Sequence, residues 1–262
     1  MRKHFFAPPR ISYRFIPIWQ RNFLVWKKLA ASSIIGHLAD PVIYMLGLGY
    51  GLGGMLPAME GGMSYMAFLA AGMVCYSTMN SASFEALYSG FSRMHEQRTW
   101  DAILNTPVTL DDIVFSEVVW AASKSLLSGI AVLLVVWALG LSHSLLSLWV
   151  IPLAFLVGLA FSAIGLVMTA LAPSYDFFMY YFTLVITPMM LLCGVFFPVE
   201  QLPSWLQAVS AVLPLSHGVD IARPLLNGQL PPNLPMHIAA LAGYALAGFY
   251  ISLVLFRRRL SQ

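Results

Sequence analysis

Long runs of apolar residues alternate with short polar connections along most of this chain. Each run is long enough for a helix, at about 1.5 Å per residue, to cross the roughly 30 Å hydrocarbon core of a bilayer. We therefore predict membrane-crossing helices over residues 34–55, 64–84, 118–139, 148–171, 177–195 and 236–256. The expected fold is an all-α integral membrane protein, with six transmembrane helices in a single domain over residues 1–262.

An amphipathic helix is predicted over residues 17–29, before the first span. Its apolar face carries Ile18, Trp19, Phe23, Val25 and Trp26, and its polar face carries Gln20, Arg21, Lys27 and Lys28. A helix with aromatic residues on one face and basic residues on the other is typical of the headgroup plane of a membrane. The alternative is a helix that packs on a soluble partner.

The connection over residues 91–107 holds a second short amphipathic helix. It contains Arg93, Glu96, Arg98 and Asp101, and the stop signal Asn105-Thr106-Pro107 closes it. A membrane gives no reason for so many charges in a short connection. We expect this helix to dock another protein, and the alternative is a solvated link.

The segment before the last span is apolar but too short to cross. Pro203 and Pro214 bound it, so it has only about half the length of a span. We expect residues 197–228 to form a re-entrant or interfacial hairpin in the outer leaflet. The outer water boundary would then be marked by Trp205, His217, Asp220 and Arg223.

Two of the spans carry charged residues. Asp40-Pro41 interrupts the first, so this helix is either kinked at the proline or starts earlier and carries Asp40 inside. His37 shares a face with Asp40, but two ligands on one helix are a weak metal signal, and we predict a polar-lined entry instead of a metal site. Lys124 lies near the inner end of the third span and is expected to snorkel to the headgroups or pair with Glu117 or Glu85.

Most basic residues border the spans on one side, and the exceptions are Arg223 in the last outer connection and Lys124 inside a span. Seven precede the first span, two lie in the second connection and three follow the last span. This is the positive-inside pattern of a multi-pass membrane protein with both termini in the cytoplasm.

Composition agrees, because 59% hydrophobic and 10% charged residues leave too little polar surface for a soluble globule. The net charge of +3 does not indicate nucleic acid, since the basic residues lie at membrane borders and suit contacts with anionic lipids. Cys75 and Cys193 lie within spans and are expected to be packing residues. We expect no cleaved presequence.

Several kinds of chemistry lack their motifs. There is no G-x-x-x-x-G-K-[ST] loop, so any dependence on ATP must come from a separate subunit. The G-x-S-x-G, H-E-x-x-H and C-x-x-C motifs are also missing, which disfavours a hydrolase or metalloenzyme. The spans lack the chain of carboxylates and the internal repeat expected of a secondary transporter.

The order of these elements, together with several local motifs, resembles the permease subunit of type-2 ABC exporters, and more narrowly their nodulation-factor (NodJ-type) branch. The similar stretches run over nearly the whole chain and are Gly36-His37-Leu38-Ala39-Asp40-Pro41, Phe68-Leu69-Ala70-Ala71-Gly72-Met73, Gln97-Arg98-Thr99-Trp100, Ala172-Pro173-Ser174-Tyr175-Asp176, Ile186-Thr187-Pro188-Met189, Phe197-Pro198-Val199, Gln201-Leu202-Pro203 and Leu213-Pro214-Leu215 with His217.

The resemblance implies that two copies of this permease pair with two copies of a cytoplasmic ABC ATP-binding subunit in the bacterial inner membrane. The chain itself would bind no cofactor, and ATP and magnesium would lie on the partner subunit. The inner helix would dock into that subunit, with the coupling residues Arg93, Glu96, Gln97, Arg98, Thr99, Trp100 and Asp101. The outer hairpin would help to close the external side of the dimer.

The branch is associated with export of lipochitooligosaccharides, so the resemblance implies an amphiphile with a sugar head, although another glycolipid or a hydrophobic compound fits equally. The residues we expect along the substrate path are Glu85, Glu117, Lys124, Tyr76, Tyr180, Tyr181 and Phe197. Two competing hypotheses are an ATP-independent channel or carrier for a hydrophobic solute, and an intramembrane enzyme that uses His37 and Asp40.

Overall fold

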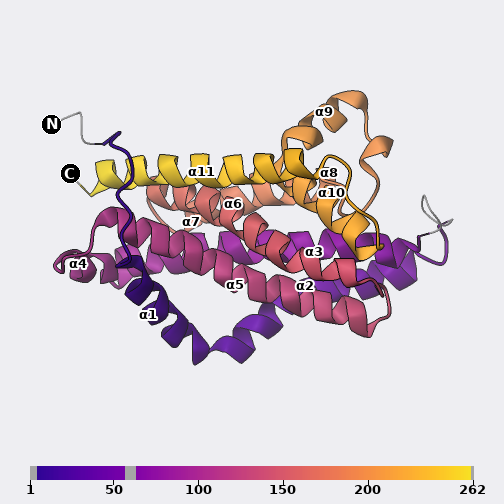
Figure 1. Ribbon diagram of the computed structural model, residues 1–262, viewed down its shortest axis with the longest axis horizontal. Coiled ribbons are helices and arrows are strands. Elements are labelled where there is room, and N and C mark those ends of the chain that lie inside the picture. Colours follow the sequence, from indigo (N-terminus) through magenta and orange to yellow (C-terminus); the bar gives the residue numbers. More distant parts are fainter. Residues whose placement is uncertain (1–4, 57–62, 261–262) are drawn as a thin grey trace.

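A computed structural model describes residues 5–56 and 63–260, and every regular element within these ranges is helical. The long helices lie side by side along one axis, and the two ends of the described chain lie at the same end of the bundle (Figure 1). We call this the terminal end, and we call the opposite end, where α9 and α10 meet, the hairpin end. The predicted all-α class is confirmed.

The α-helices are α1 (Phe15–Lys27), α2 (Ala30–Gly51), α3 (Tyr65–Phe84), α4 (Thr99–Leu104), α5 (Leu110–Ala138), α6 (Val150–Leu171), α7 (Asp176–Tyr181), α8 (Thr187–Leu192), α9 (Ser204–Val212), α10 (Pro214–Leu226) and α11 (Leu234–Arg259). Segments of π-helix occur at η3 (Glu85–Ser89), η4 (Ser92–Glu96) and η6 (Phe182–Ile186). Turns of 3₁₀-helix occur at η5 (Leu145–Trp149) and η7 (Val199–Gln201).

Four helical stretches of the described chain are long and apolar enough to cross a membrane: α2, α5, η5 with α6, and α11. The stretch Asp176–Leu192 is apolar but shorter. Helix α3 is long enough, but its second half is rich in hydroxyl and amide side chains, with Ser77, Thr78, Asn80, Ser81 and Ser83. Six crossings therefore stay a prediction.

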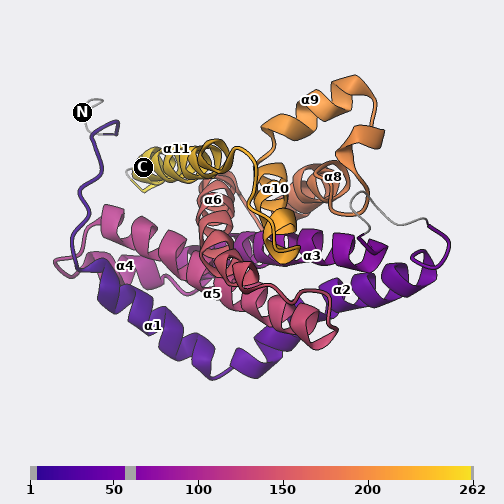
Figure 2. The ribbon, with the colours of Figure 1, turned by 45° about the vertical axis from the view of Figure 1, so that its right-hand side comes forward.

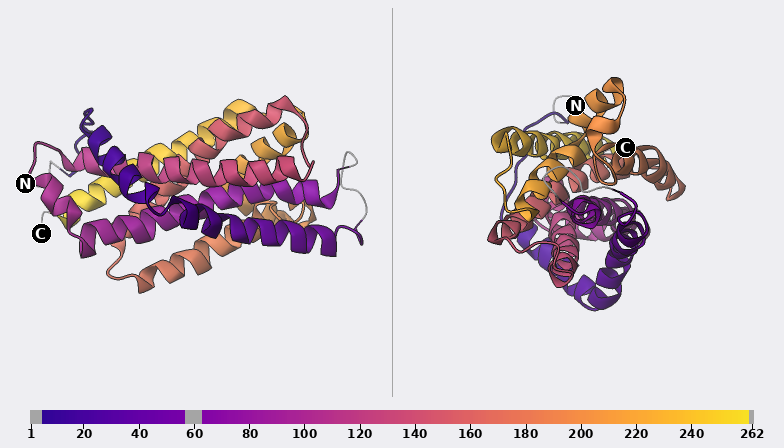
Figure 3. Two further views of the ribbon diagram at one scale, coloured as in Figure 1. Left: turned by 90° about the horizontal axis from the view of Figure 1, so that it is seen from below. Right: turned by 90° about the vertical axis from the view of Figure 1, so that its right-hand side faces the viewer.

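Helix α3 is polar because it lies at the centre of the bundle, where it packs against α2, α5, α6 and α10 (Figures 2 and 3). The hydroxyl groups of Ser77 and Thr78 find partners inside the protein. Thr78 donates to the carbonyl of Val74 at 2.8 Å, and the hydroxyls of Ser77 and Ser128 lie 2.7 Å apart. The bond between Ser77 and Ser128 joins α3 to α5, and in a bilayer such bonds hold together helices that have no hydrophobic force between them.

The structure of α2 decides between the two alternatives for Asp40-Pro41, a kink at the proline or an earlier helix start. The helix starts at Ala30 and runs through Pro41 as one element, so Asp40 lies inside it and is exposed. Helix α5 starts at Leu110, eight residues before the predicted residue 118, because Thr109 and Asp112 form a capping box. The T-x-x-D signal is readable in the sequence, and it extends α5 beyond the apolar run that defined the predicted span.

The fifth apolar segment is broken into α7, η6 and α8 instead of the single helix predicted over residues 177–195. Pro188 lies in the first turn of α8, directly after the π-helical turn of η6. A proline cannot donate to the preceding turn, and a local π-bulge accommodates the missing bond. The backbone N–H of Thr187 donates to the carbonyl of Phe182, and the Thr187 hydroxyl donates to the same carbonyl at 3.0 Å. Helix α8 ends at Leu192, and Gly194 then turns the chain with a positive φ of 71°.

The single helix expected over residues 91–107 is two short segments, η4 and α4. They are separated by Arg98, whose φ of 47° is left-handed. A left-handed residue ends a helix, so the chain turns between the two segments. The predicted end is confirmed, since α4 stops at Leu104, just before Asn105-Thr106-Pro107.

Helix α1 spans Phe15–Lys27 and packs against α5. Three aromatic side chains of its apolar face, Trp19, Phe23 and Trp26, surround Trp120 of α5 at ring-centroid distances of 6.1–6.4 Å. Much of the apolar face of α1, which we expected to contact lipid, therefore packs against α5. Leu24 and Val25 stay exposed.

A hydrogen-bonded clasp fastens the terminal end. Arg257, near the end of α11, reaches Asp111 at the start of α5 with distances of 2.6 and 3.2 Å. It also donates to the carbonyls of Phe5 and Ala7. The backbone N–H of Ser12 donates to Asp112 at 2.6 Å. The N-terminal segment, α5 and α11 are thus joined next to η4 and α4.

Candidate functional site

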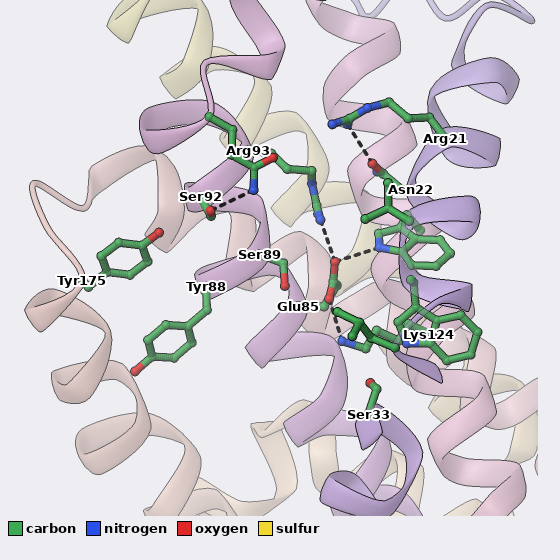
Figure 4. A pocket seen from close by; sticks show the side chains of 15 residues that line it. Arg21, Asn22, Ser33, Glu85, Tyr88, Ser89, Ser92, Arg93, Lys124 and Tyr175 are labelled. Atoms are coloured by element: carbon green, nitrogen blue, oxygen red, sulfur yellow. Dashed lines mark hydrogen bonds and ion pairs between the residues drawn. The ribbon is translucent and has the colours of Figure 1, made fainter. Parts of the chain in front are cut away.

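A polar pocket of about 440 Å³ opens near the terminal end, between α1, η3, η4 and α5 (Figure 4). Its walls are mostly hydrogen-bonding and aromatic side chains, in contrast to the apolar bundle around it. They are Arg21, Asn22, Val25, Trp26, Leu29, Ser33, Glu85, Tyr88, Ser89, Ser92, Arg93, Gln97, Trp120, Lys124 and Tyr175.

Glu85 lies at the centre of this wall and is 3% exposed. Its carboxylate accepts three hydrogen bonds, from Trp120 Nε1 at 2.7 Å, Arg93 at 2.9 Å and Lys124 Nζ at 2.8 Å. Burial by itself raises the pKa of this carboxyl, but the charges of Arg93 and Lys124 outweigh burial and lower the pKa to about 2. Glu85 is therefore ionised at neutral pH.

Arg93 joins Glu85 to a second buried carboxylate, Glu117 of α5. Its guanidinium forms a two-pronged contact with Glu117, with Nε at 3.0 Å from Oε1 and a second nitrogen on Oε2. The amide of Asn22 on α1 lies 3.5 Å from Glu117. We call Glu85, Arg93, Glu117 and Lys124 the ion cluster. Two positive and two negative charges balance in it.

Helical spacing brings these residues together. Glu85, Ser89 and Arg93 follow each other at intervals of four along η3 and η4, so they share one face. Glu117 and Lys124 are seven residues apart on α5 and also share a face. The two faces meet because α5 packs against η3.

The sequence predicted part of this cluster. We expected Lys124 to snorkel or to pair with Glu117 or Glu85, and the structure places Lys124 in contact with Glu85. Arg93 was assigned to docking of a partner, whereas the structure turns its side chain inward to both glutamates. The eight-residue spacing of Glu85 and Arg93 is a signal that could have found this role.

Arg21 and Asn22 of α1 line the pocket without having been predicted there. The Arg21 guanidinium donates to the Asn22 side chain at 3.2 Å and to Thr99 Oγ1, at the first residue of α4, at 3.3 Å. Burial, and then the like charge of Arg93, lower the pKa of Arg21. Glu117 opposes this effect but is already engaged by Arg93.

Aromatic side chains form the remaining walls. The rings of Tyr88 and Tyr175 are stacked with centroids 6.0 Å apart, on the side opposite to Arg21 and Asn22 (Figure 4). Rings and fixed polar groups together suit a flat, hydroxyl-bearing or charged head group. At the rim, Val25 and Leu29 are 56% and 65% exposed. The pocket therefore presents a polar interior behind an apolar edge.

The aromatic residues predicted for the substrate path do not line this pocket. Tyr76 and Tyr181 are buried in the bundle, Tyr180 is 61% exposed on α7, and Phe197 is half-buried near the hairpin end. Glu85 and Lys124 line the pocket, and Glu117 lies behind Arg93. A substrate path through the four aromatic residues stays a prediction.

The predicted coupling residues divide into two groups. Glu96, Gln97, Arg98 and Asp101 are exposed on η4, the link and α4, and Thr99 is half-buried. Trp100 is buried and packs edge-on against Phe256 of α11, with centroids 4.9 Å apart. Any surface for a partner is therefore made by the exposed group, while Trp100 connects α4 to the end of α11.

Metal ligands do not gather among the described residues, where no group of three or more His, Cys, Asp or Glu side chains has suitable geometry. His37 instead lies edge-on to Phe84, with centroids 6.1 Å apart. Cys75 and Cys193 are both buried and free, in agreement with their predicted packing role.

Comparisons with known proteins give one consistent picture. The family described as ABC-2 type transporter matches residues 13–226. The chain is 48% identical over 254 residues to "Nodulation protein J" of Rhizobium meliloti (strain 1021), covering 97% of both chains. It is 49% identical over 254 residues to the protein of the same name from Rhizobium leguminosarum bv. viciae, covering 97% of this chain and 98% of that one. It is 26% identical over 205 residues to "Inner membrane transport permease YadH" of Escherichia coli (strain K12), covering 78% of each.

Proposed function

The chain belongs to the ABC-2 type transporter family, and from this premise we propose that it is the permease subunit of an ATP-driven exporter of an amphiphile. The observation that carries the proposal is the polar pocket behind an apolar rim, next to the charged segment η4–α4. An amphiphile in the inner leaflet would place its polar head in the pocket while its tail stays in lipid. The nodulation-factor resemblance favours a lipochitooligosaccharide or another glycolipid as this amphiphile.

The family implies an ATP-binding partner subunit, because its members are membrane components of transporters. We propose two copies of that subunit and two copies of this permease in the bacterial inner membrane. ATP and magnesium would be bound by the partner and not by this chain. The terminal end would face the cytoplasm, which agrees with the basic residues near both termini.

Arg93 connects the substrate pocket to η4–α4, the segment proposed to dock the ATP-binding subunit. It belongs to η4, which leads into α4, and it lines the pocket through its contacts with Glu85 and Glu117. When the ATP-binding subunits close, movement of η4–α4 would pull on Arg93 and rearrange the ion cluster. The clasp between Arg257 and Asp111 and the contact of Trp100 with Phe256 would carry the same movement to α5 and α11.

Complex formation with an ATP-binding subunit tests the proposal. We expect the purified permease to retain the product of a neighbouring ATP-binding gene and to raise its rate of ATP hydrolysis. A control with an ATP-binding subunit from an unrelated transporter should give neither result. Absence of both binding and stimulation with the neighbouring subunit would argue against an ATP-driven permease.

An ATP-independent channel or carrier is the second candidate, and the buried charge of Lys124 favours it. The structure gives this charge another explanation, since Lys124 is paired with Glu85 within the ion cluster. Solute flux through vesicles that contain the permease alone would support the second candidate.

A further inference from the structure

The charges of the pocket do not cancel once Arg21 is counted. Glu85 and Glu117 contribute two negative charges, whereas Arg93, Lys124 and Arg21 contribute three positive ones, so one positive charge is left over. The four groups of the ion cluster neutralise each other through contacts of 2.8–3.0 Å and one shorter contact. The surplus charge therefore belongs to Arg21.

Arg21 has only neutral hydrogen-bonding partners. Its two contacts go to the amide of Asn22 and the hydroxyl of Thr99, and across the described ranges 5–56 and 63–260 no carboxylate forms an ion pair with it. The two contacts are long, at 3.2 and 3.3 Å, and use one donor on each of two nitrogens. A guanidinium carries five donors, so others are free to meet a ligand.

A cation in this environment favours an anionic ligand. The guanidinium is half-buried beside Arg93, and both its burial and that like charge disfavour its protonated form. An oxyanion at Arg21 would relieve both effects, and the planar fork of arginine suits phosphate, sulfate and carboxylate.

The rim of the pocket indicates that this anion is attached to an apolar tail. Val25 and Leu29 lie four residues apart on the side of the mouth formed by α1 and the start of α2, and both are largely exposed. A free anion gains nothing from such an edge, whereas an acyl chain would cover it.

We propose that the pocket binds the anionic head group of an amphiphile, with Arg21 as its charge partner and Asn22, Ser89 and Ser92 as further hydrogen-bonding groups. This inference deepens the proposed function, since the exported amphiphile or a neighbouring phospholipid would supply such a head. The bound anion would also compete with Thr99 for Arg21, and so would act directly on the first residue of α4.

The test measures lipid preference on the full-length permease alone, reconstituted in phosphatidylcholine nanodiscs without any ATP-binding subunit. Trp26 and Trp120 line the pocket, so a phosphatidylglycerol with a brominated acyl chain should quench tryptophan fluorescence when it binds. Brominated phosphatidylcholine serves as the zwitterionic comparison. We expect R21Q to reduce the preference for phosphatidylglycerol about tenfold, as for loss of one charged hydrogen-bonding group.

Lys27→Gln is the matched control, because it removes one positive charge from the same helix at an exposed position that does not line the pocket. It should leave the preference within about twofold of the unmodified protein, because exposed charges interact weakly. Arg21→Lys should keep part of the preference, since it retains the charge without the fork.

The proposal is overturned if R21Q keeps the full preference, or if K27Q loses as much as R21Q does. Inorganic phosphate added to the nanodiscs distinguishes a lipid-attached head group from a free anion as the ligand. Lack of displacement by phosphate supports a lipid head group, and ready displacement overturns the assignment to an amphiphile. Because no ATP-binding subunit is present, failure here leaves the complex-formation test of the proposed function untouched.

Discussion

Replacing Glu85 with Gln is expected to lower the apparent melting temperature of the purified permease by about 10 °C, which corresponds to roughly 3–5 kcal/mol. Glu85 is 3% exposed and is the only carboxylate in contact with Lys124 in the described part of the chain. Glutamine can still accept the hydrogen bond from Trp120, so the loss of stability reports on the removed charge. Without Glu85, the ion cluster holds Arg93, Lys124 and Glu117 and keeps one uncompensated positive charge.

The double variant E85Q with Lys124→Met sharpens this prediction. It leaves Arg93 facing Glu117, which is a balanced pair, and methionine replaces the lysine stem with an apolar chain of similar length. We expect the double variant to melt closer to the unmodified protein than either single variant does. The control is Glu200→Gln, which removes a carboxylate at an exposed position of η7 and should leave the melting temperature unchanged. Simple additivity of the two single effects would show that the cluster does not act as one electrostatic unit.

Loss of coupling is the second large effect we expect. A triple variant with Glu96→Ala, Arg98→Asn and Asp101→Ala should abolish stimulation of ATP hydrolysis in the partner subunit, while the basal rate of that subunit is unchanged. These three side chains are exposed on η4, the link and α4, and they are the charges a docked protein would meet. Asparagine is chosen at position 98 because it tolerates the left-handed backbone found there.

Trp100 is left intact in this variant because it is buried against Phe256, so changing it would disturb the core as well as the surface. A matched control replaces Glu200 and Gln201 with Ala, since both are exposed on η7, which packs against α9 at the hairpin end. The control should retain stimulation. If the triple variant stimulates hydrolysis as the unmodified protein does, docking through η4–α4 is wrong.

Apolar runs correctly predicted an all-α fold of long helices, because the length of a crossing helix follows directly from the thickness of the bilayer. The six crossings and the cytoplasmic side of the basic residues stay predictions. Apolar runs failed where a local polar signal altered a helix. The capping box of Thr109 and Asp112 moved the start of α5, and the π-turn before Pro188 divided the fifth segment. Helix α3 shows a further limit, since a helix buried among others need not be as apolar as one that faces lipid.

The pocket was harder to predict than the spans because its residues come from elements far apart in the chain. Lys124 was identified as a charge inside a span, and its pairing with Glu85 was one of the alternatives that the geometry supports. The contact of Arg93 with Glu117 depends on the packing of η3 against α5, which no single stretch of sequence encodes. Arg21 was assigned to the polar face of an amphipathic helix in the headgroup plane, and only the packing of α1 on α5 brings it to the pocket.

The central claim, that this permease moves an amphiphile outward with energy from a separate subunit, is tested most directly in sealed vesicles. The permease would be reconstituted with the neighbouring ATP-binding subunit and a fluorescent lipochitooligosaccharide, and the fraction of probe in each leaflet would be followed after ATP is added. We predict movement away from the leaflet that holds the ATP-binding subunit, dependent on ATP and on both proteins. Movement that is equally fast without ATP, or with the permease alone, would contradict the claim.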